Sequence, residues 1–211
     1  MSQGLFIVIE GPEGAGKSTL AAALAERLRE AGADVVPVRE PGGTVPAELA
    51  RQALLDPSSD LDPETELLFV TAARAHLVQA VIRPALEAGR TVLSDRYDLS
   101  TMAYQAAGRG LPADVVRTVN RAATRGLIPD LTIVLDIAPA EGRRRQLAVG
   151  KGTDRFERED AAFHERVRAA YQAARGEGIV HIDASAAPPV VLEAAWAAIQ
   201  ERMAPRGAGR D

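Results

Sequence analysis

The sequence predicts an α/β fold of three layers, in which a five-stranded parallel sheet carries helices on both faces. Two observations lead to this expectation. Short apolar runs of strand length alternate along the chain with longer runs of helical periodicity. Such alternation is typical of parallel strands joined by helices that cover both sides of the sheet. Right-handed connections then place the carboxyl ends of the strands along one edge, where such sheets bind their ligands.

Five runs have the length and composition of buried strands. The first, Leu-Phe-Ile-Val-Ile at 5–9, combines β-branched and aromatic side chains. The other four cover residues 35–38, 91–94, 131–135 and 179–182.

Helical patterns separate these strands. The first helix is predicted over 18–31, because leucines recur every four residues from Leu20 to Leu28 and Gly32 follows. A long helix is expected over 65–88, with a kink at Pro84. The remaining helices are expected at 100–107, 113–124, 138–148, 159–174 and 189–203.

The 211 residues are predicted to form a single domain over 1–204. Residues 147–158 combine glycine with charge, which favours a short mobile lid over an interdomain linker. The Gly- and Arg-rich segment 205–211 is expected to be a disordered tail.

Composition excludes several classes of function. The formal net charge is -4 and the pI about 5.5, which argues against a nucleic-acid partner. Without cysteine there are no disulfides, thiolate metal sites or thiol nucleophiles. The first residues lack the pattern of a signal peptide, and no uninterrupted apolar run reaches the roughly 18 residues of a membrane span. We therefore expect a cytoplasmic protein without a membrane partner.

A phosphate-binding loop follows the first strand. Gly11-Pro12-Glu13-Gly14-Ala15-Gly16-Lys17-Ser18 matches G-x-x-x-x-G-K-[ST] between a strand and a helix. The glycines let backbone N–H groups surround phosphates, and the helix start adds partial positive charge. Lys17 is expected to reach the β- and γ-phosphates of ATP, and the Ser18 hydroxyl to ligate Mg²⁺.

Glu13 is unusual in an anion-binding loop, because a carboxylate repels phosphate. One interpretation is an acceptor for a hydroxyl group on a second substrate. The alternative is a surface carboxylate favoured by the dipole at a helix start. The loop by itself leaves both open.

Further charged residues fall at the same sheet edge. Asp95 and Arg96 follow the third strand directly, so Asp95 is a candidate Mg²⁺ partner and Arg96 a candidate phosphate ligand. Arg39 ends the second strand, at the start of a loop with Pro41-Gly42-Gly43. Arg74 lies on the apolar long helix and needs an anion, either a protein carboxylate or a ligand phosphate. A structural Asp95–Arg96 pair is the alternative to a catalytic one.

Two other segments suggest ligand contacts. Tyr104 and Gln105, before Gly108-Arg109-Gly110, suit a turn that packs on a sugar and reads a base edge, although a plain helix end explains them as well. The basic stretch that includes Arg144, Lys151 and Arg155 suits a closing lid that brings cations to developing charge.

Taken together, these residues resemble the bacterial thymidylate kinase family, whose members phosphorylate dTMP with ATP. The resemblance runs from Phe6 to about Asp183. Its most specific parts are the Arg-Glu-Pro-Gly-Gly-Thr run at 39–44 and the Ala-Tyr-Gln…Gly-Arg-Gly run at 103–110, with the phosphate loop, Ala73-Arg74, Asp95-Arg96-Tyr97 and Pro129-Asp130-Leu131-Thr132 around them.

The resemblance implies the P-loop kinase fold, in-line transfer of the γ-phosphoryl group with lid closure, and a homodimer. It implies that Glu13 accepts a hydrogen bond from the 3′-hydroxyl of dTMP. Arg74 and Arg96 would hold the dTMP phosphate, with Arg39 in the same substrate set, and the lid would supply a catalytic cation from Arg144, Lys151 or Arg155. Around the base and sugar it implies Thr101, Tyr104 and Gln105.

The sequence departs from the family pattern at one wall of the base site. The family usually has a Phe four residues before the Arg74 position, where this chain has Val70, and its Phe is Phe69. Neighbouring helical residues point about 100° apart. Phe69 therefore reaches the base only through a local shift, or Val70 forms the wall with another residue.

Three rival functions remain open. Another nucleoside monophosphate kinase, for dUMP, GMP or AMP, would share most of these features. A GTPase switch would need an Asn-Lys-x-Asp motif, which the sequence lacks. A non-catalytic module would bind ATP without phosphoryl transfer.

Overall fold

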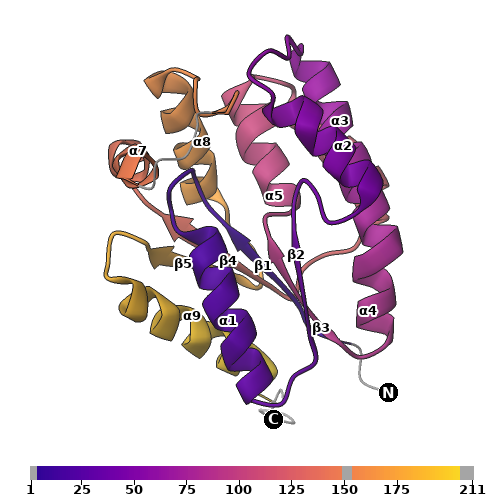
Figure 1. Cartoon of the computed structure of the whole chain (residues 1–211), viewed down its shortest axis with the longest axis vertical. Helices are drawn as coiled ribbons and strands as arrows, with labels where there is room; N and C mark the ends of the chain where they lie inside the picture. The colour runs from indigo at the N-terminus through magenta and orange to yellow at the C-terminus, as the bar shows by residue number, and fades with distance from the viewer. Residues whose placement is uncertain (1–3, 149–153, 205–211) are drawn as a thin grey trace, which may run out of the picture.

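The computed structural model describes residues 4–148 and 154–204. Within them, five parallel strands form one sheet in the order β2-β3-β1-β4-β5 (Figure 1). The strands are β1 (Phe6–Glu10), β2 (Val35–Arg39), β3 (Thr91–Asp95), β4 (Leu131–Asp136) and β5 (Ile179–Asp183). The expected three-layer fold and its parallel sheet are therefore confirmed.

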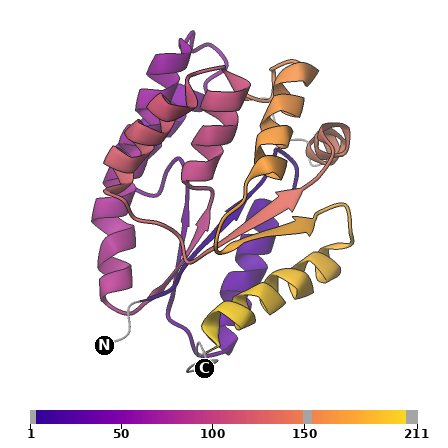
Figure 2. The same ribbon diagram turned by 180° about the vertical axis from the view of Figure 1, so that it is seen from behind.

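Helices cover both faces of the sheet (Figures 1 and 2). The α-helices are α1 (Lys17–Glu30), α2 (Val45–Leu55), α3 (Pro63–Leu77), α4 (Arg83–Glu87), α5 (Asp98–Thr101), α6 (Ala113–Thr124), α7 (Pro139–Ala148), α8 (Ala161–Ala173) and α9 (Pro188–Met203). Two π-helical segments, η1 (Val78–Ile82) and η2 (Met102–Gly108), continue α3 and α5.

The side chains of β1 point alternately to the two faces of the sheet and join a separate hydrophobic core on each face. Ile7 and Ile9 pack with α1 and α9 on one face, whereas Phe6 and Val8 pack with the α3–η1–α4 helix on the other. Every residue of β1 is buried, as expected for the central strand of a parallel sheet. Burial on both faces fixes the strand rigidly, and with it the loop that follows Glu10.

The sequence located every strand, but each strand of the structure ends one residue later than predicted. The added residues are polar or charged: Glu10, Arg39, Asp95, Asp136 and Asp183. An apolar pattern stops before them, although backbone pairing continues, with Asp95 opposite Ile9. These residues project at the carboxyl edge, where the site forms.

One helix was not predicted. α2 follows the Pro-Gly-Gly loop, and its start is signalled by the Thr44 side chain, which accepts a 3.3 Å hydrogen bond from the Ala47 N–H. The expected kink at Pro84 is replaced by η1, so helical structure is continuous from 63 to 87.

This continuous segment, Pro63–Glu87, is long and apolar enough to cross a membrane by length and composition alone. Half of its most apolar 18-residue window is buried inside the molecule. Its apolar side packs on the sheet, and core helices of water-soluble proteins pass the same test, so it is weak evidence for a membrane span.

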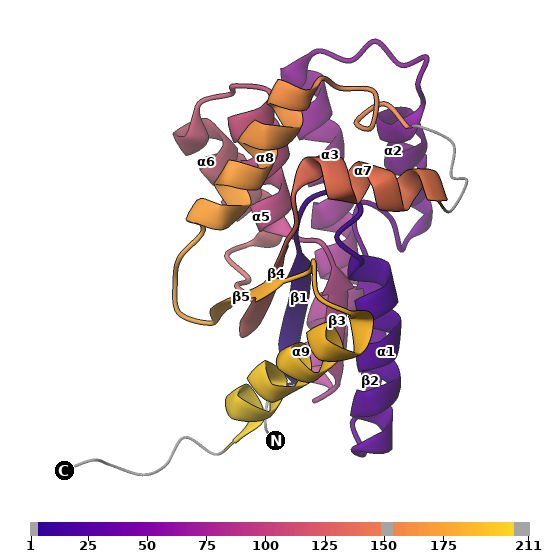
Figure 3. The same ribbon diagram turned by 90° about the vertical axis from the view of Figure 1, so that its left-hand side faces the viewer.

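α7 crosses the carboxyl edge of the sheet beside the phosphate loop (Figure 3). Of the predicted lid at 147–158, only 147–148 and 154–158 belong to the described residues; 149–153 lie outside them, as does the predicted tail at 205–211.

Candidate active site

The phosphate loop lies between β1 and α1, as the sequence predicted. Gly11, Gly14 and Gly16 have φ values of 140°, 71° and 90°, which side chains with a Cβ rarely adopt. No side chain caps the start of α1, so its first N–H groups remain available to an anion. The loop therefore has the backbone conformation that a phosphate cradle requires.

Lys17 lies over this loop. Its Nζ donates hydrogen bonds to the Gly11 and Pro12 carbonyl oxygens, at 3.0 and 2.8 Å. Burial lowers the pKa of Lys17 to about 8, with the nearby charge of Arg96 adding to the effect and Glu13 opposing it. A ligand that brings negative charge would therefore stabilise the charged ammonium form of Lys17.

α7 packs closely on the loop through two glycines. A Cβ atom on Gly142 would lie 2.3 Å from the Glu13 carbonyl oxygen, and one on Gly14 would lie 2.2 Å from the Gly142 carbonyl oxygen. α7, the helix that leads into the predicted lid, is therefore in backbone contact with the loop itself.

Ser18 and Asp95, predicted as metal partners, lie together. The Ser18 hydroxyl donates a 2.6 Å hydrogen bond to Asp95 Oδ2. Asp95 reaches this position because β3 pairs with β1 and ends beside the loop.

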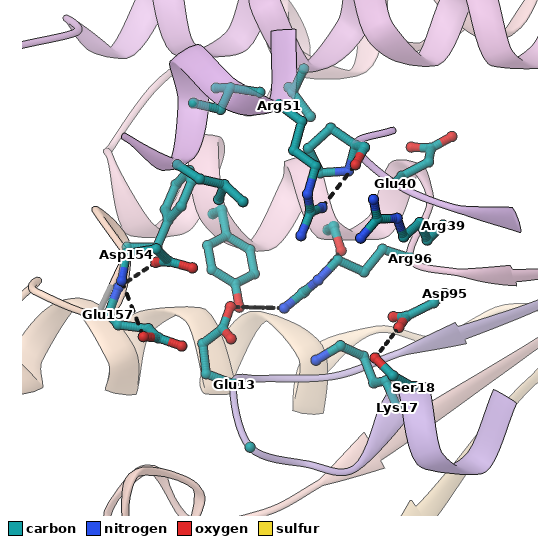
Figure 4. A pocket seen from close by; sticks show the side chains of 18 of the residues that line it. Glu13, Lys17, Ser18, Arg39, Glu40, Arg51, Asp95, Arg96, Asp154 and Glu157 are labelled. Carbon is teal, nitrogen blue, oxygen red and sulfur yellow. Dashed lines mark hydrogen bonds and ion pairs between the residues drawn. The ribbon is translucent and has the colours of Figure 1, made fainter. Parts of the chain in front are cut away.

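Glu13 points away from the loop's interior, toward Arg96 (Figure 4). It also contacts Tyr104. Arg96 Nη2 and the Tyr104 hydroxyl each donate to Glu13 Oε1 at 2.8 Å. Burial by itself would raise the pKa of Glu13, but the charges of Arg96 and Lys17 and the hydrogen bond from Tyr104 lower it to about 2. Glu13 is therefore an ionised acceptor beside the phosphate loop.

Arg96 adopts an uncommon backbone conformation, with φ at 76°. Residues other than glycine rarely occupy this left-handed region, and such strain is often found at functional sites. The guanidinium also contacts Ser100 Oγ at 3.3 Å and the Tyr171 hydroxyl at 3.2 Å.

A buried carboxylate, Glu10, organises these supporting groups. It accepts hydrogen bonds from the Tyr97 N–H at 2.8 Å, Ser100 Oγ at 2.6 Å and the Tyr171 hydroxyl at 3.0 Å. Burial raises the pKa of Glu10, while these hydrogen bonds oppose the rise. Sequence reasoning missed Glu10, because a strand-ending Glu next to a glycine loop gives no signal that α5 and α8 meet it.

A cavity of about 350 Å³ joins these groups. The sequence-predicted residues that line it are Glu13, Gly14, Gly16, Lys17, Ser18, Arg39, Asp95, Arg96, Tyr104 and Gln105. It runs from the phosphate loop to Val70 and Leu54, so one continuous space connects a phosphate cradle with a partly apolar end.

Comparison with known proteins agrees with this geometry. The family model for thymidylate kinase matches residues 9–194. The chain belongs to the thymidylate kinase family.

Individual relatives match over most of their length. The thymidylate kinase of Deinococcus radiodurans is 48% identical over 206 residues, which cover 96% of this chain and 99% of the relative. That of Thermomicrobium roseum is 50% identical over 201 residues, covering 94% and 95%. That of Ectopseudomonas mendocina is 53% identical over 169 residues, 80% of each chain.

Arg74 and Thr101, which the resemblance placed around dTMP, do not line the cavity. Arg74 is buried outside the cavity lining, with Nε bonded to Glu40 at 2.6 Å and Nη1 to Thr101 and Asn120 at 2.6 Å. Its Nη2 donates to the Tyr97 carbonyl oxygen at 2.8 Å. Because these protein acceptors occupy the guanidinium, Arg74 supports the cavity wall in this structure rather than presenting donors to a phosphate.

Phe69 also lies outside the cavity. It packs against Ala47, Ala50 and Ala73 between α2 and α3, while Val70 lines the cavity. α3 is a continuous helix over these two residues, so their side chains point in different directions. Val70 therefore lines the cavity while Phe69 does not, and Phe156 is an aromatic residue of the same lining.

The three predicted lid cations have different positions. Arg144 is exposed and paired with Glu141 at 2.7 Å, and Arg155 turns away from the phosphate loop toward Glu66, at 2.5 Å. Lys151 lies outside the described residues. Neither described cation lines the cavity.

The cavity also contains residues that sequence reasoning missed. Arg51 of α2 lines it, half-buried, and its Nη1 donates to the Pro41 carbonyl oxygen at 2.8 Å. Gln146 of α7 donates to Glu157 and lies 3.5 Å from Glu13 Oε2. Arg51 was missed together with its helix, which Thr44, Pro46 and Glu48 could have revealed as a capped helix start.

Proposed function

We propose that this chain transfers the γ-phosphoryl group of ATP to dTMP, giving ADP and dTDP. The observation that carries the proposal is the continuous cavity that runs from the phosphate loop, past the cluster of Glu13, Arg96 and Tyr104, to a partly apolar end. One end suits a triphosphate donor, and the other suits a phosphorylated nucleoside. Membership of the thymidylate kinase family supports the choice of acceptor.

At the donor end, the N–H groups of residues 11–18 would surround the β- and γ-phosphates of ATP. Lys17 would leave its carbonyl partners and donate to phosphate oxygens, which offer full negative charge in place of a dipole. The backbone already has the required conformation, so little reorganisation accompanies binding.

The donor set fits Mg²⁺. Ser18 Oγ and Asp95 Oδ2 are hard oxygen donors 2.6 Å apart beside the loop. Among the described residues, no group of three or more His, Cys, Asp or Glu side chains could hold a metal by itself. That agrees with Mg²⁺, which usually takes one or two protein oxygens together with substrate phosphates and water. When bound there, Mg²⁺ would neutralise charge on the β- and γ-phosphates.

At the acceptor end, Glu13 would accept a hydrogen bond from the 3′-hydroxyl of dTMP, which suits an ionised carboxylate. Arg96, with Arg39 and Arg51 on the same cavity wall, would hold the acceptor phosphate. Tyr104 would pack on the deoxyribose, and Gln105 would contact the base.

The transfer itself needs no general base. A phosphate oxygen of dTMP, already ionised at neutral pH, forms the new bond to the γ-phosphorus. The bond from that phosphorus to the β–γ bridging oxygen breaks, and ADP leaves with the electron pair. Arg96 and Lys17 stabilise the charge in transit, and closure of the lid, of which residues 154–158 are described, excludes water.

We assign the lid cation to Arg144 or Lys151 rather than to Arg155. Arg155 is held by Glu66 and by the Leu54 carbonyl oxygen, so it is already committed elsewhere. Arg144 belongs to α7, which is in backbone contact with the phosphate loop through Gly142.

A homodimer is supported by exposed apolar side chains on two neighbouring helices. Val45 and Leu49 of α2 and Leu68 of α3 are exposed by 78%, 63% and 61%, and the two helices pack side by side. Analytical ultracentrifugation tests this proposal. We expect the enzyme to act in the cytoplasm without a membrane partner, and the net charge of -4 argues against a nucleic-acid partner.

The proposed reaction is tested by a panel of monophosphates with purified protein and Mg-ATP, with ADP release followed in a coupled assay. We expect dTMP to have the highest kcat/KM, with dUMP, GMP and AMP far below it. A higher value for another monophosphate would replace the acceptor, and ATP binding without transfer to any of them would indicate a non-catalytic module.

A further inference from the structure

Another buried carboxylate, Glu66, lies behind the part of the cavity that Gln105 lines. Glu66 of α3 has no exposed surface and does not line the cavity. Its neighbour Gln105 does line the cavity and is almost completely buried. Glu66 can therefore affect a ligand only through the groups that it holds.

Three segments meet at Glu66. Gln105 Nε2, from η2, donates to Glu66 Oε1 at 2.6 Å. Arg155 Nη2 donates to Glu66 Oε2 at 2.5 Å, and Arg109 Nε donates to Oε2 at 3.1 Å and, at the longer distance of 3.3 Å, to Oε1. Arg109 is held in turn by Glu159 at 2.6 Å. The two guanidinium groups fix the position of the carboxylate, and its other oxygen faces the Gln105 amide.

This contact determines which way the Gln105 amide points. A carboxylate only accepts hydrogen bonds, so the amide nitrogen must face Glu66. Turning the amide over would place its carbonyl oxygen against Oε1 and would lose a charge-assisted hydrogen bond in a buried site. In the part of the chain that the structure describes, the side-chain amide oxygen Oε1 of Gln105 accepts no hydrogen bond, so it remains available, with the second N–H of the amide, to a ligand in the cavity.

We propose that Glu66 is a positioning residue for base discrimination: by fixing the Gln105 amide, it selects thymine over cytosine. This inference rests on the proposed function. Thymine presents an N3–H donor and an O4 acceptor, which match a carbonyl oxygen and an N–H. Cytosine presents an acceptor and an amino donor at the same places, so it would need the amide turned over. A buried polar group left without a partner makes such a mismatch costly.

The Glu66→Gln variant tests the proposal. Arg109 and Arg155 still require an acceptor, so the new amide oxygen would face them and its nitrogen would face Gln105. Gln105 would then turn its carbonyl oxygen inward. We expect the ratio of kcat/KM for dTMP to that for dCMP to fall by at least about tenfold relative to the unsubstituted chain. Both substrates are measured on the same preparation, so the ratio does not depend on the folded fraction.

Two further variants keep the proposal falsifiable. Gln105→Met removes the amide but leaves Glu66 with both arginines, and it should also lower the ratio. Glu159→Gln removes a charged partner of Arg109 without touching the Glu66–Gln105 contact, and it should keep the ratio of the unsubstituted chain.

An unchanged ratio in Glu66→Gln or in Gln105→Met overturns the inference. A fall of the ratio in Glu159→Gln as large as that in Glu66→Gln also overturns it. The loss of any charge in this cluster would then be enough to lower the ratio, whether or not the Gln105 amide is affected. Absence of dTMP phosphorylation by the unsubstituted chain sinks the proposed function instead, and it is seen before any variant is compared.

Discussion

The Ser18 hydroxyl donates a 2.6 Å hydrogen bond to the Asp95 carboxylate, although the two residues are 77 positions apart in the chain. The pairing of β3 with β1 brings them together, since Asp95 ends β3 opposite Ile9. Their oxygens form the part of the site that suits Mg²⁺.

Asp95→Asn should raise the Mg²⁺ concentration needed for half-maximal activity by about tenfold, because an amide oxygen carries no net charge for the cation. The measurement is a Mg²⁺ titration of the rate at fixed ATP. Asp183→Asn, at the exposed end of β5, is the matched control and should leave the titration unchanged. An identical Mg²⁺ requirement in Asp95→Asn would remove Asp95 from the metal site.

Deprotonation of Lys17 should cause kcat/KM for ATP to fall at alkaline pH. Its pKa is lowered to about 8, so the free enzyme loses this positive charge above that pH. kcat/KM for ATP reports the free enzyme and should fall about tenfold per pH unit above the pKa. At saturating ATP, phosphate charge favours the ammonium form, so kcat should remain flat through pH 8. A Lys17→Arg variant that shows the same fall would assign it to another group.

The local signals in the sequence were sufficient for the sheet and the phosphate loop. Apolar runs locate strands, and G-x-x-x-x-G-K-[ST] is contiguous, so Gly11 to Ser18 could be placed without tertiary information. Asp95 and Arg96 could be placed as well, because parallel strands share one carboxyl edge. These local signals do not determine whether a side chain from another element points toward that edge or away from it.

Arg74 illustrates the limit. Its apolar helix predicted that a partner anion was needed, and both a carboxylate and a ligand phosphate satisfied that requirement. Glu40 and Asn120, its partners, are 34 and 46 residues away, and no local pattern joins them to Arg74. Similarly, the phase of α3 decides that Val70 rather than Phe69 faces the cavity, and the π-helical turn η2 sets the directions of Tyr104 and Gln105.

Ionisation of Glu13 should make the free energy of unfolding depend on pH. Its folded pKa of about 2 is below the usual value of 4.5, so the folded state binds the proton less readily than the unfolded state. The stabilisation is therefore complete above pH 4.5 and is lost as the pH falls toward 2. It amounts to about 3 kcal/mol, at about 1.4 kcal/mol per pKa unit.

Urea denaturation of Glu13→Gln and the unsubstituted chain between pH 7 and pH 2 measures this effect. The difference in free energy of unfolding should shrink as the pH falls. A constant difference would show that ionisation of Glu13 does not contribute. Glu193→Gln, which removes an exposed partner of Arg27, should follow the unsubstituted chain across the range.

Arg96 should separate backbone strain from side-chain function. Arg96→Ala and Arg96→Gly both remove the guanidinium, and each should lower kcat/KM for dTMP by at least roughly tenfold, or about 1.4 kcal/mol of transition-state stabilisation. Glycine adopts the φ of 76° without strain, so Arg96→Gly should be more stable than Arg96→Ala by about 1 kcal/mol. Arg90→Ala, far from the cavity, is the control. Near-normal kinetics for either Arg96 variant would sink the assignment.

Close packing at Gly142 should couple the position of α7 to the affinity for ATP. In Gly142→Ala, the new methyl group would lie 2.3 Å from the Glu13 carbonyl oxygen, so either α7 or the phosphate loop must move. Overpacking of this kind costs about 1–3 kcal/mol, and the displaced loop should raise KM for ATP severalfold. Gly176→Ala is a matched control, since its nearest neighbour would be the Ile179 side chain at 3.4 Å, an ordinary contact.

Thermal denaturation and ATP saturation curves measure both effects. If Gly142→Ala binds ATP as the unsubstituted chain does while losing stability, α7 has moved and the loop is independent of it. Weaker ATP binding places α7 among the elements that hold the phosphate loop in its binding conformation.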